Sequence, residues 1–550
     1  MKKSFFVALL LLCCTLNNVQ GQGNKQNERP KLVVGIVIDQ MRWDYLHRFY
    51  DRFTDGGFKR LMNEGFSCDN TMLNYIPTVT AIGHSCIYTG SVPSIHGIAG
   101  NNFYKDGQKV YCTDDASVES VGTDSDDGKM SPRNLLVTTV GDELKLATNF
   151  RSKVIGVSLK DRASILPAGH TADGAYWFDD KTGRFITSTY YKKELPEWVK
   201  AFNKQDLARK MLSQDWNTLY PIDTYAESTE DNNKFETPLV KGSKPVFPVK
   251  TSGMFAKKGY SAIRTTPYGN SLTLALAKAA LKGEQLGQGS NTDFLAISFS
   301  STDYVGHQFG TYAIELEDTY LRLDKDLADL FSTLDANVGK GNYMLFLTAD
   351  HAAAHNFTFM QAHNIPAEGF IVPQKEKALN EYLQKTFPTA QKALVKDILN
   401  YQVFFDKDYI RSAGLDFAAV KAAAIEFLEQ DKQIAYVADM EKLSNVTWPE
   451  IIRQCAINGY NRFRSGDIQL IMQPGNYEIS SASHTGGTTH GVWNPYDAHI
   501  PLLFMGWNIQ AGHTMKPVHM TDIAPTVCAL LHIQMPNGCI GSAILPVIGE

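Results

Sequence analysis

The sequence predicts an α/β fold in which helices pack on both faces of a mostly parallel central β-sheet. Three observations favour it. Several apolar runs are continuous, as in strands that are buried on both faces. Segments of helical character lie between several of these runs, and acidic residues stand where several of them end. Because ligands bind beyond the carboxyl ends of the strands in open parallel sheets, we expect those acidic residues to share one edge of the sheet.

The predicted elements follow one another along the chain. The first strand is the run 31–39 (KLVVGIVID), which ends in Asp39, and the runs 154–159, 293–299, 343–348 and 500–504 repeat its pattern. The predicted helices span 134–148, 271–282, 315–334 and 521–531. Asp522 lies near the start of the last helix, where a carboxylate suits the helix dipole.

Two stretches interrupt the alternation of strands and helices. Residues 168–262 are rich in aromatic residues, Gly and Pro, and residues 356–485 mix helical and irregular sequence. We interpret both as insertions that build walls over a site. The core then consists of residues 31–167, 263–355 and 486–550, and the chain has no internal repeat that would suggest a string of small domains.

The N-terminus predicts export. Residues 1–21 have a basic start and an apolar run over 5–12, which is shorter than the roughly 18–20 residues of a membrane span, so they are typical of a secretory signal peptide. Residues 22–30 follow as a polar linker. We expect a periplasmic or secreted protein without a transmembrane segment, with lipoprotein anchoring at Cys13 or Cys14 as the alternative. The six later cysteines are expected to be buried thiols or structural disulfides.

The formal net charge is −5, and the sequence has no cluster of basic residues of the kind that binds nucleic acid. An anionic substrate therefore needs positive charge supplied locally, and Lys160 and Arg162 can supply it. We expect them on an extended segment, where residues two apart point the same way. Arg offers a bidentate fork to a phosphate, and Lys acts as a compact point charge.

Six side chains form a candidate ligand set for two divalent metal ions. They are Asp39, Asp303, His307, Asp350, His351 and His490. Asp303 and His307 are four residues apart, so they can share a metal if the segment is helical. Asp350 and His351 directly follow an apolar run, where burying an unpaired charge is costly. His490 lies in a Gly/Thr-rich loop (486–493), and mixed oxygen and nitrogen ligands suit borderline ions such as zinc.

Thr80 is the candidate nucleophile. It follows Pro77 and leads into small residues, a pattern that suits a tight turn at a helix start, where backbone N–H groups favour an anion. Its hydroxyl needs a base or a metal to become reactive. Asn101, which follows Gly100, can present its amide N–H to an oxyanion. His84 and His96, each beside a glycine, are expected to be structural.

These residues resemble a known family. The series Pro77, Thr80, His84, Thr89-Gly90, Pro93, His96-Gly97 and Asn101 is similar to the nucleophile region of the alkaline phosphatase superfamily. The six candidate ligands match the two-zinc site of that superfamily. The stretches 159–163 (LKDRA) and 301–307 (STDYVGH) look most like the PafA-type bacterial alkaline phosphatases, close to the nucleotide pyrophosphatase/phosphodiesterase branch.

The resemblance implies an alkaline-phosphatase-like sandwich that hydrolyses phosphate monoesters through a phosphothreonine on Thr80. It implies two Zn²⁺ ions, one held by Asp303, His307 and His490, the other by Asp39, Asp350 and His351 with Thr80 joining. It also implies that Asn101, Lys160 and Arg162 contact the phosphoryl oxygens. One departure is Ala352, where the superfamily commonly has Gly; a positive φ there would cost about 1 kcal/mol.

The alternative activity is that of a phosphodiesterase or nucleotide pyrophosphatase of the same superfamily. A monoester dianion has three non-bridging oxygens, which two zinc ions, Asn101, Lys160 and Arg162 match, whereas a diester needs a pocket for a second organic group. Neither Cys68 nor Cys86 begins the C-x-P-x-R run of a sulfatase. A catalytically inactive binding module is disfavoured by the complete ligand set. We therefore expect a monomeric enzyme that acts on small-molecule phosphate monoesters.

Overall fold

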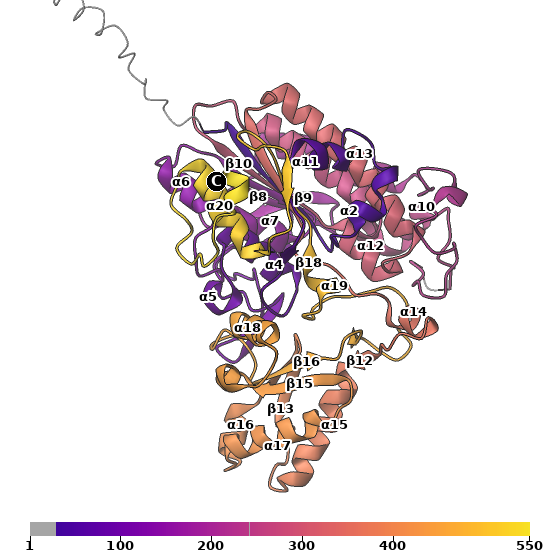
Figure 1. Cartoon of the computed structure of the whole chain (residues 1–550), viewed down its shortest axis with the longest axis vertical. Coiled ribbons are helices and arrows are strands. Elements are labelled where there is room, and N and C mark those ends of the chain that lie inside the picture. Colours follow the sequence, from indigo (N-terminus) through magenta and orange to yellow (C-terminus); the bar gives the residue numbers. More distant parts are fainter. Residues whose placement is uncertain (1–28, 241, 550) are drawn as a thin grey trace, which may run out of the picture.

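The computed structural model describes residues 29–240 and 242–549. The predicted signal peptide and nearly all of the predicted linker lie outside the described residues. A large lobe surrounds the central sheet, and a smaller lobe, coloured orange in Figure 1, lies below it. Within the described ranges, no helix combines the length and the apolar character of a membrane span.

The centre of the large lobe is a parallel sheet, as predicted. Strand β1 (Leu32–Ile38) lies between β10 (Asp293–Phe299) and β11 (Tyr343–Thr348) and is parallel to both. On the far side of β10 follow β7 (Val154–Ser158) and then β8 (Gly174–Asp179), again in parallel. All residues of these five strands are buried, which explains why they are continuous apolar or aromatic runs.

Further strands extend this sheet at both edges, where the sheet becomes mixed. The ten strands lie in the order β20-β2-β19-β11-β1-β10-β7-β8-β9-β6. The five outer strands are β20 (Gly512–Thr514), β2 (Phe66–Cys68), β19 (Leu502–Gly506), β9 (Arg184–Ser188) and β6 (Ser120–Val121). Strand β19 is antiparallel to β11. The predicted class, an α/β sandwich with a mostly parallel sheet, is confirmed.

Strands β8 and β9 lie within residues 168–262, the stretch interpreted from sequence as the first insertion. They form a hairpin that continues the central sheet, with β8 parallel to β7 and β9 antiparallel to β8. The aromatic residues of 174–179 are buried in the sheet. Their aromatic content therefore serves packing within the sheet rather than a wall over the site.

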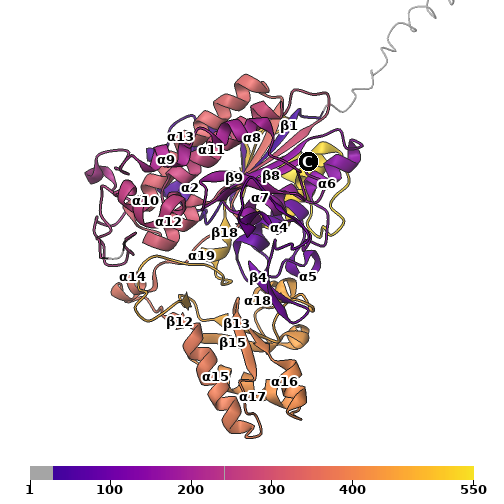
Figure 2. The same ribbon diagram turned by 180° about the vertical axis from the view of Figure 1, so that it is seen from behind.

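Helices cover both faces of the sheet. One face carries α4 (Thr80–Thr89), α6 (Val140–Ala147), α7 (Asp161–Ala168) and α20 (Ile523–Leu531), and the other carries α11 (Tyr268–Gly283), α12 (Ser301–Phe309) and α13 (Ile314–Asn337) (Figures 1 and 2). Helix α6 begins six residues later than the predicted start at residue 134. Thr139 is the N-cap residue that fixes this start, because its side chain and that of Asp142 form a capping box.

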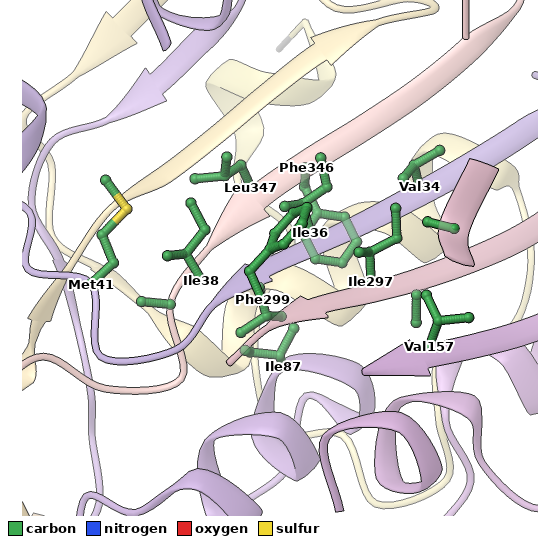
Figure 3. Close-up of a cluster of buried hydrophobic side chains, with 14 of the residues drawn as sticks. Val34, Ile36, Ile38, Met41, Ile87, Val157, Ile297, Phe299, Phe346 and Leu347 are labelled. Carbon is green, nitrogen blue, oxygen red and sulfur yellow. The ribbon is translucent and has the colours of Figure 1, made fainter. Parts of the chain in front are cut away.

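The core lies between these layers. In Figure 3, Val34, Ile36 and Ile38 of β1 lie among side chains of β7, β10, β11 and α4. The close approach of α4 to the sheet depends on Gly35, because a Cβ at this position would lie 2.5 Å from Tyr88 Oη and 2.7 Å from Phe346 Cζ. All six described cysteines after the N-terminal region are free thiols, and five of them are buried.

The smaller lobe corresponds to the second predicted insertion. Its four-stranded antiparallel sheet has the order β13-β14-β16-β15, with β13 (Val395–Leu399), β14 (Gln402–Phe405), β16 (Ile468–Met472) and β15 (Ile434–Asp439). Helices α15 (Val372–Thr386) and α17 (Phe417–Glu429) pack on it. A separate hydrophobic core that includes Leu379, Val420 and Ile468 holds these elements together.

We expect Gly35→Ala to destabilise the protein by about 1–3 kcal/mol, because the new methyl group overpacks the space between β1, Tyr88 and Phe346. The midpoint of urea unfolding measures the effect. The matched control is Gly253→Ala in α10 (Thr251–Lys258), where the nearest atom to the new Cβ is Lys250 Cβ at 4.0 Å. That variant should keep or slightly raise the midpoint, because Ala favours helix. Equal losses in both variants would contradict the packing argument.

Candidate active site

The candidate residues lie at the carboxyl edge of the central sheet. Asp39 directly follows β1, and Asp350 and His351 follow β11. Asp303 and His307 lie on α12, which begins just after β10. These three strands run in parallel and in register, with Ile38 beside Phe299 and Val37 beside Thr348, so their ends coincide. Thr80 is the first residue of α4, and the loop that carries His490 completes the group.

Asp39, Asp350 and His351 form the first cluster of ligands. All three side chains are fully buried. His351 Nε2 lies 3.7 Å from Asp39 Oδ1 and 3.5 Å from Asp350 Oδ2, and none of these three atoms has a hydrogen-bond partner. Orphaned polar atoms in a buried site cost free energy unless something binds them. A cation between them would be coordinated by all three, so this cluster fits a metal ion.

Asp303, His307 and His490 form the second cluster. Asp303 Oδ1 lies 3.0 Å from His307 Nε2 and 3.7 Å from His490 Nε2. The two clusters adjoin, because the rings of His351 and His490 stack with their centroids 3.5 Å apart. Ligand atoms of Asp303, His351 and His490 also lie within 4.8 Å of one another. His351 is therefore within reach of both clusters, and the expected division of ligands between two metals stays a prediction.

The three histidines are oriented in the same way. Their Nδ1 atoms lie within hydrogen-bond distance of backbone carbonyls: Thr488 O at 2.8 Å for His307, Ala352 O at 3.0 Å for His351 and Thr78 O at 2.6 Å for His490. A carbonyl only accepts, so Nδ1 carries the proton in each ring. When the ring is neutral, the Nε2 lone pair faces the carboxylates, and this tautomer is the one that binds metal.

Burial and charge shift the pKa values of the site in opposite directions. Burial, and then the negative charge of Asp350, raises the pKa of Asp39 well above its usual range. Burial also acts to raise the pKa of Asp303, but the positive charges of His307 and Lys160 outweigh it and hold that pKa well below its usual range. Burial lowers the pKa of His351 and of His490, which keeps both rings neutral and able to bind metal.

Lys160 joins the two clusters. Its Nζ donates hydrogen bonds to Asp39 Oδ2 and Asp303 Oδ2, both at 2.6 Å, and lies 3.5 Å from Thr80 Oγ1. Burial acts to lower its pKa, but the charges of Asp303 and Asp39 outweigh burial and raise it above its ordinary value. The ammonium group therefore stays charged beside the threonine hydroxyl.

Asn101 lies beside the start of α4. Its Oδ1 accepts a hydrogen bond of 2.9 Å from the backbone N–H of Ala81, the second residue of α4. The carboxamide is thus fixed at the start of α4 through its oxygen. Its amide N–H group remains available for an acceptor, as the sequence predicts.

The backbone conformation at Arg162 differs from the predicted one. The extended segment expected for residues 160–162 does not exist, because α7 begins at Asp161 and Lys160 is its N-cap residue. Arg162 therefore lies in the first turn of a helix. Its Nη1 donates to Tyr111 Oη at 2.9 Å, and Tyr111 Oη in turn donates to Asp161 Oδ1 at 2.9 Å. The structure gives Arg162 this contact with Tyr111 and no hydrogen bond to Thr80.

Several supporting residues were not predicted. Gln40 Nε2 donates to Asp303 Oδ1 at 2.7 Å, and its backbone N–H donates to Asp350 Oδ1 at 3.2 Å. Its position directly after Asp39 was the available signal. Buried Asp497 accepts hydrogen bonds from Thr78 Oγ1 and from the N–H of Gly491, and so fixes the loop of His490. No sequence pattern marks Asp497, because it acts only through tertiary contacts.

Two further expectations concern single positions near the site. His84 is structural as predicted: its Nδ1 lies 2.9 Å from Thr80 O and its Nε2 lies 2.9 Å from Ser298 Oγ. His96 is likewise held between the backbone N–H of Ile98 and Cys86 Sγ. Ala352 is not among the residues with positive φ, so the absence of Gly there costs no backbone strain.

Comparison with known proteins extends these observations. Residues 33–494 match the model of a family described as type I phosphodiesterase / nucleotide pyrophosphatase. The chain is 54% identical over 95% of both chains to the alkaline phosphatase PafA of Elizabethkingia meningoseptica. It is 52% identical over 99% of both chains to the alkaline phosphatase PhoV of Synechococcus elongatus. The crystal structure of wild-type PafA superposes with a TM-score of 0.92 at 52% identity, covering 95% of this chain and 99% of that one.

We expect His307→Ala to lower the amount of tightly bound divalent metal by at least one equivalent per chain, because it removes a ligand from the second cluster. Elemental analysis of protein that has been loaded with zinc and dialysed measures this. The matched control is His363→Ala, whose side chain is exposed and lies against the Phe359 ring outside both clusters. Unchanged metal content in His307→Ala would exclude His307 as a ligand.

Proposed function

This chain belongs to the type I phosphodiesterase / nucleotide pyrophosphatase family, and we propose that it is an alkaline phosphatase that hydrolyses phosphate monoesters. The observation that carries the proposal is the convergence of Thr80 with three aspartates and three histidines at one buried edge of the sheet. Relatives named alkaline phosphatases share more than half of its residues over nearly the whole chain.

We assign two zinc ions to the ligand clusters, one to Asp39, Asp350 and His351 and the other to Asp303, His307 and His490. The orphaned atoms of the first cluster and the shared Nε2 orientation of the histidines support metal binding. Mixed carboxylate and imidazole ligands favour zinc over Mg²⁺ or Ca²⁺, which take oxygen ligands. When bound, the ions would act as Lewis acids that increase the reactivity of the Thr80 hydroxyl and neutralise charge on phosphate oxygens.

Thr80 is the proposed nucleophile. Its place at the first residue of α4 puts it where backbone N–H groups and the helix dipole favour an anion. Lys160 is the cation nearest to its hydroxyl, but the raised pKa of Lys160 keeps it protonated, so it does not serve as the base that removes the Thr80 proton. Lys160 instead supplies fixed positive charge to the phosphoryl group.

The reaction takes two steps. Thr80 Oγ1 attacks phosphorus in line, the bond between phosphorus and the ester oxygen breaks, and the alcohol leaves after taking a proton. The phosphoryl group is then bound to Thr80. Water attacks the same phosphorus from the opposite side, inorganic phosphate leaves, and Thr80 recovers its proton. Asn101, which is bound to the N–H of Ala81, and Lys160, which lies 3.5 Å from Thr80 Oγ1, are the proposed contacts for the non-bridging oxygens, with Arg162 as a further donor from the start of α7.

The same donors favour a monoester over a diester. A monoester dianion presents one more charged oxygen than a diester monoanion, and Lys160 and Arg162 add two positive charges to those of the metals. Hydrolysis of diesters or nucleotide pyrophosphates remains the alternative within this family. Export to the periplasm or medium, which rests on the sequence of residues 1–21, and a monomeric state are further proposals.

We expect Thr80→Ala to lower kcat for an aryl phosphate monoester by at least a factor on the order of 10³, because the covalent route is lost. Thr80→Ser should retain most of the activity. Both variants should bind the same amount of zinc as the wild type, which shows that the ligand clusters are intact. A wild-type rate in Thr80→Ala would rule out the proposed nucleophile.

We expect Lys160→Ala to lower kcat/KM about 10- to 100-fold for an aryl monoester, and less for the matched aryl diester, because a charged hydrogen bond to the dianion is lost. Lys193→Ala, at an exposed lysine, is the control and should leave both rates unchanged. Both substrates are assayed with and without zinc after chelation. Equal losses for the two substrates would contradict the role of Lys160, and faster diester hydrolysis by the wild type would favour the alternative activity.

A further inference from the structure

An aromatic ring lies beside the Lys160 ammonium. Lys160 Nζ lies over the ring of Tyr304, 4.9 Å from its centroid, which is the geometry of a cation–π contact. Tyr304 is the residue after Asp303 on α12, and its side chain is half-buried. The ring is thus a third neighbour of the ammonium, besides the carboxylates of Asp39 and Asp303.

Arg264 contacts both this ring and the backbone that leads into Lys160. Its Nη1 donates to Tyr304 Oη at 3.3 Å and to Leu159 O at 3.2 Å. Leu159 directly precedes Lys160, which is the N-cap residue of α7. The guanidinium carbon of Arg264 also lies over the Tyr304 ring, 5.6 Å from its centroid. One guanidinium group therefore holds the aromatic neighbour of the ammonium and the start of the helix that carries it.

The Arg264 side chain is itself anchored at the end of β8. Its Nε donates to the two carboxylate oxygens of Asp180 at 2.8 and 3.1 Å, and its Nη2 donates to Phe178 O at 3.2 Å. The side chain is only 14% exposed, so solvent competes little for these hydrogen bonds. A planar guanidinium can serve all of these acceptors at once, whereas the ammonium of a lysine is a single point charge.

These contacts do not use the carboxylates that hold the ammonium from the other elements. Asp39 and Asp303 are proposed metal ligands, so an ion bound there shares them with Lys160. The Tyr304 ring and the Leu159 carbonyl belong to neither ligand cluster. They can therefore hold Lys160 in place while the carboxylates bind metal.

We propose that Tyr304 and Arg264 are positioning residues that keep the Lys160 ammonium beside Thr80 Oγ1, where it meets the phosphoryl group. The ring attracts the ammonium, and Arg264 fixes the ring relative to the start of α7. This role rests on the proposed phosphatase function. Because both residues act through Lys160, their removal should weaken hydrolysis of a monoester dianion more than that of a diester, as removal of Lys160 does.

Tyr304→Leu, in the full chain loaded with zinc, tests the role of the ring. We expect kcat/KM for an aryl monoester to fall about 3- to 30-fold, the range of a cation–π contact, and to fall less for the matched aryl diester. Tyr304→Phe keeps the ring and should stay closer to the wild type. The matched control is Tyr50→Leu, because Lys59 Nζ lies 5.1 Å from the centroid of the Tyr50 ring in a pair that includes no site residue. It should leave both rates within twofold.

Arg264→Lys tests the guanidinium fork, because it keeps the charge but cannot serve the same acceptors. The same selective loss for the monoester is expected. Arg411→Lys, at a side chain that is 81% exposed, is its control and should change neither rate. A double-mutant cycle separates positioning from a general structural effect: in the Lys160→Ala background, Tyr304→Leu should change kcat/KM by less than about twofold, because the positioned group is gone.

Several results would overturn this role alone. They are losses of equal size for both substrates, a loss that persists in the Lys160→Ala background, and wild-type rates in both Tyr304→Leu and Arg264→Lys. A lowered zinc content in Tyr304→Leu would also overturn it, because the effect would then pass through Asp303. Either variant suffices if the other does not fold. A wild type without monoesterase activity would overturn the proposed function and this role together.

Discussion

The burial of three aspartates within reach of one another at the carboxyl edge of the central sheet is the constraint on which the rest of the site depends. Asp39, Asp303 and Asp350 repel one another in a region shielded from water, and burial raises the cost of their charge. Lys160 offsets part of that charge through two hydrogen bonds of 2.6 Å. The remaining orphaned oxygens fit further cations, so a metal ion bound there would also stabilise the fold of this region.

The surrounding structure fixes the groups that meet this charge. Backbone carbonyls orient the histidines, and Asp497 holds the loop of His490. The smaller lobe also supports the segment that follows Asn101. Asn400 Nδ2 donates to the carbonyl of Asn102 at 3.0 Å, next to Asn101, and Tyr104 Oη donates to Asp397 Oδ2 at 3.1 Å. The hairpin that starts beside Asn101 is therefore supported by an insertion more than 290 residues away in sequence.

Two kinds of buried acid coexist in this molecule, and their partners explain the difference. The aspartates at the sheet edge have imidazole and ammonium neighbours, a combination that suits zinc and a phosphate dianion together. Glu236 and Glu315 are buried as well, but Glu236 Oε2 and Glu315 Oε1 have no hydrogen-bond partner, and burial raises the pKa of both carboxyl groups.

The sequence alone determined the fold class and the convergence of the ligands, because continuous apolar runs that end in Asp39 or Asp350 specify buried parallel strands whose ends must coincide. It also placed Thr80 at a helix start. Only the tertiary structure decided that β8 belongs to the sheet, that Arg162 lies in a helix, and that Gln40 and Asp497 support the site. The reason is physical: strand periodicity is local, whereas the partner of a buried polar atom lies far away in sequence and is set by packing.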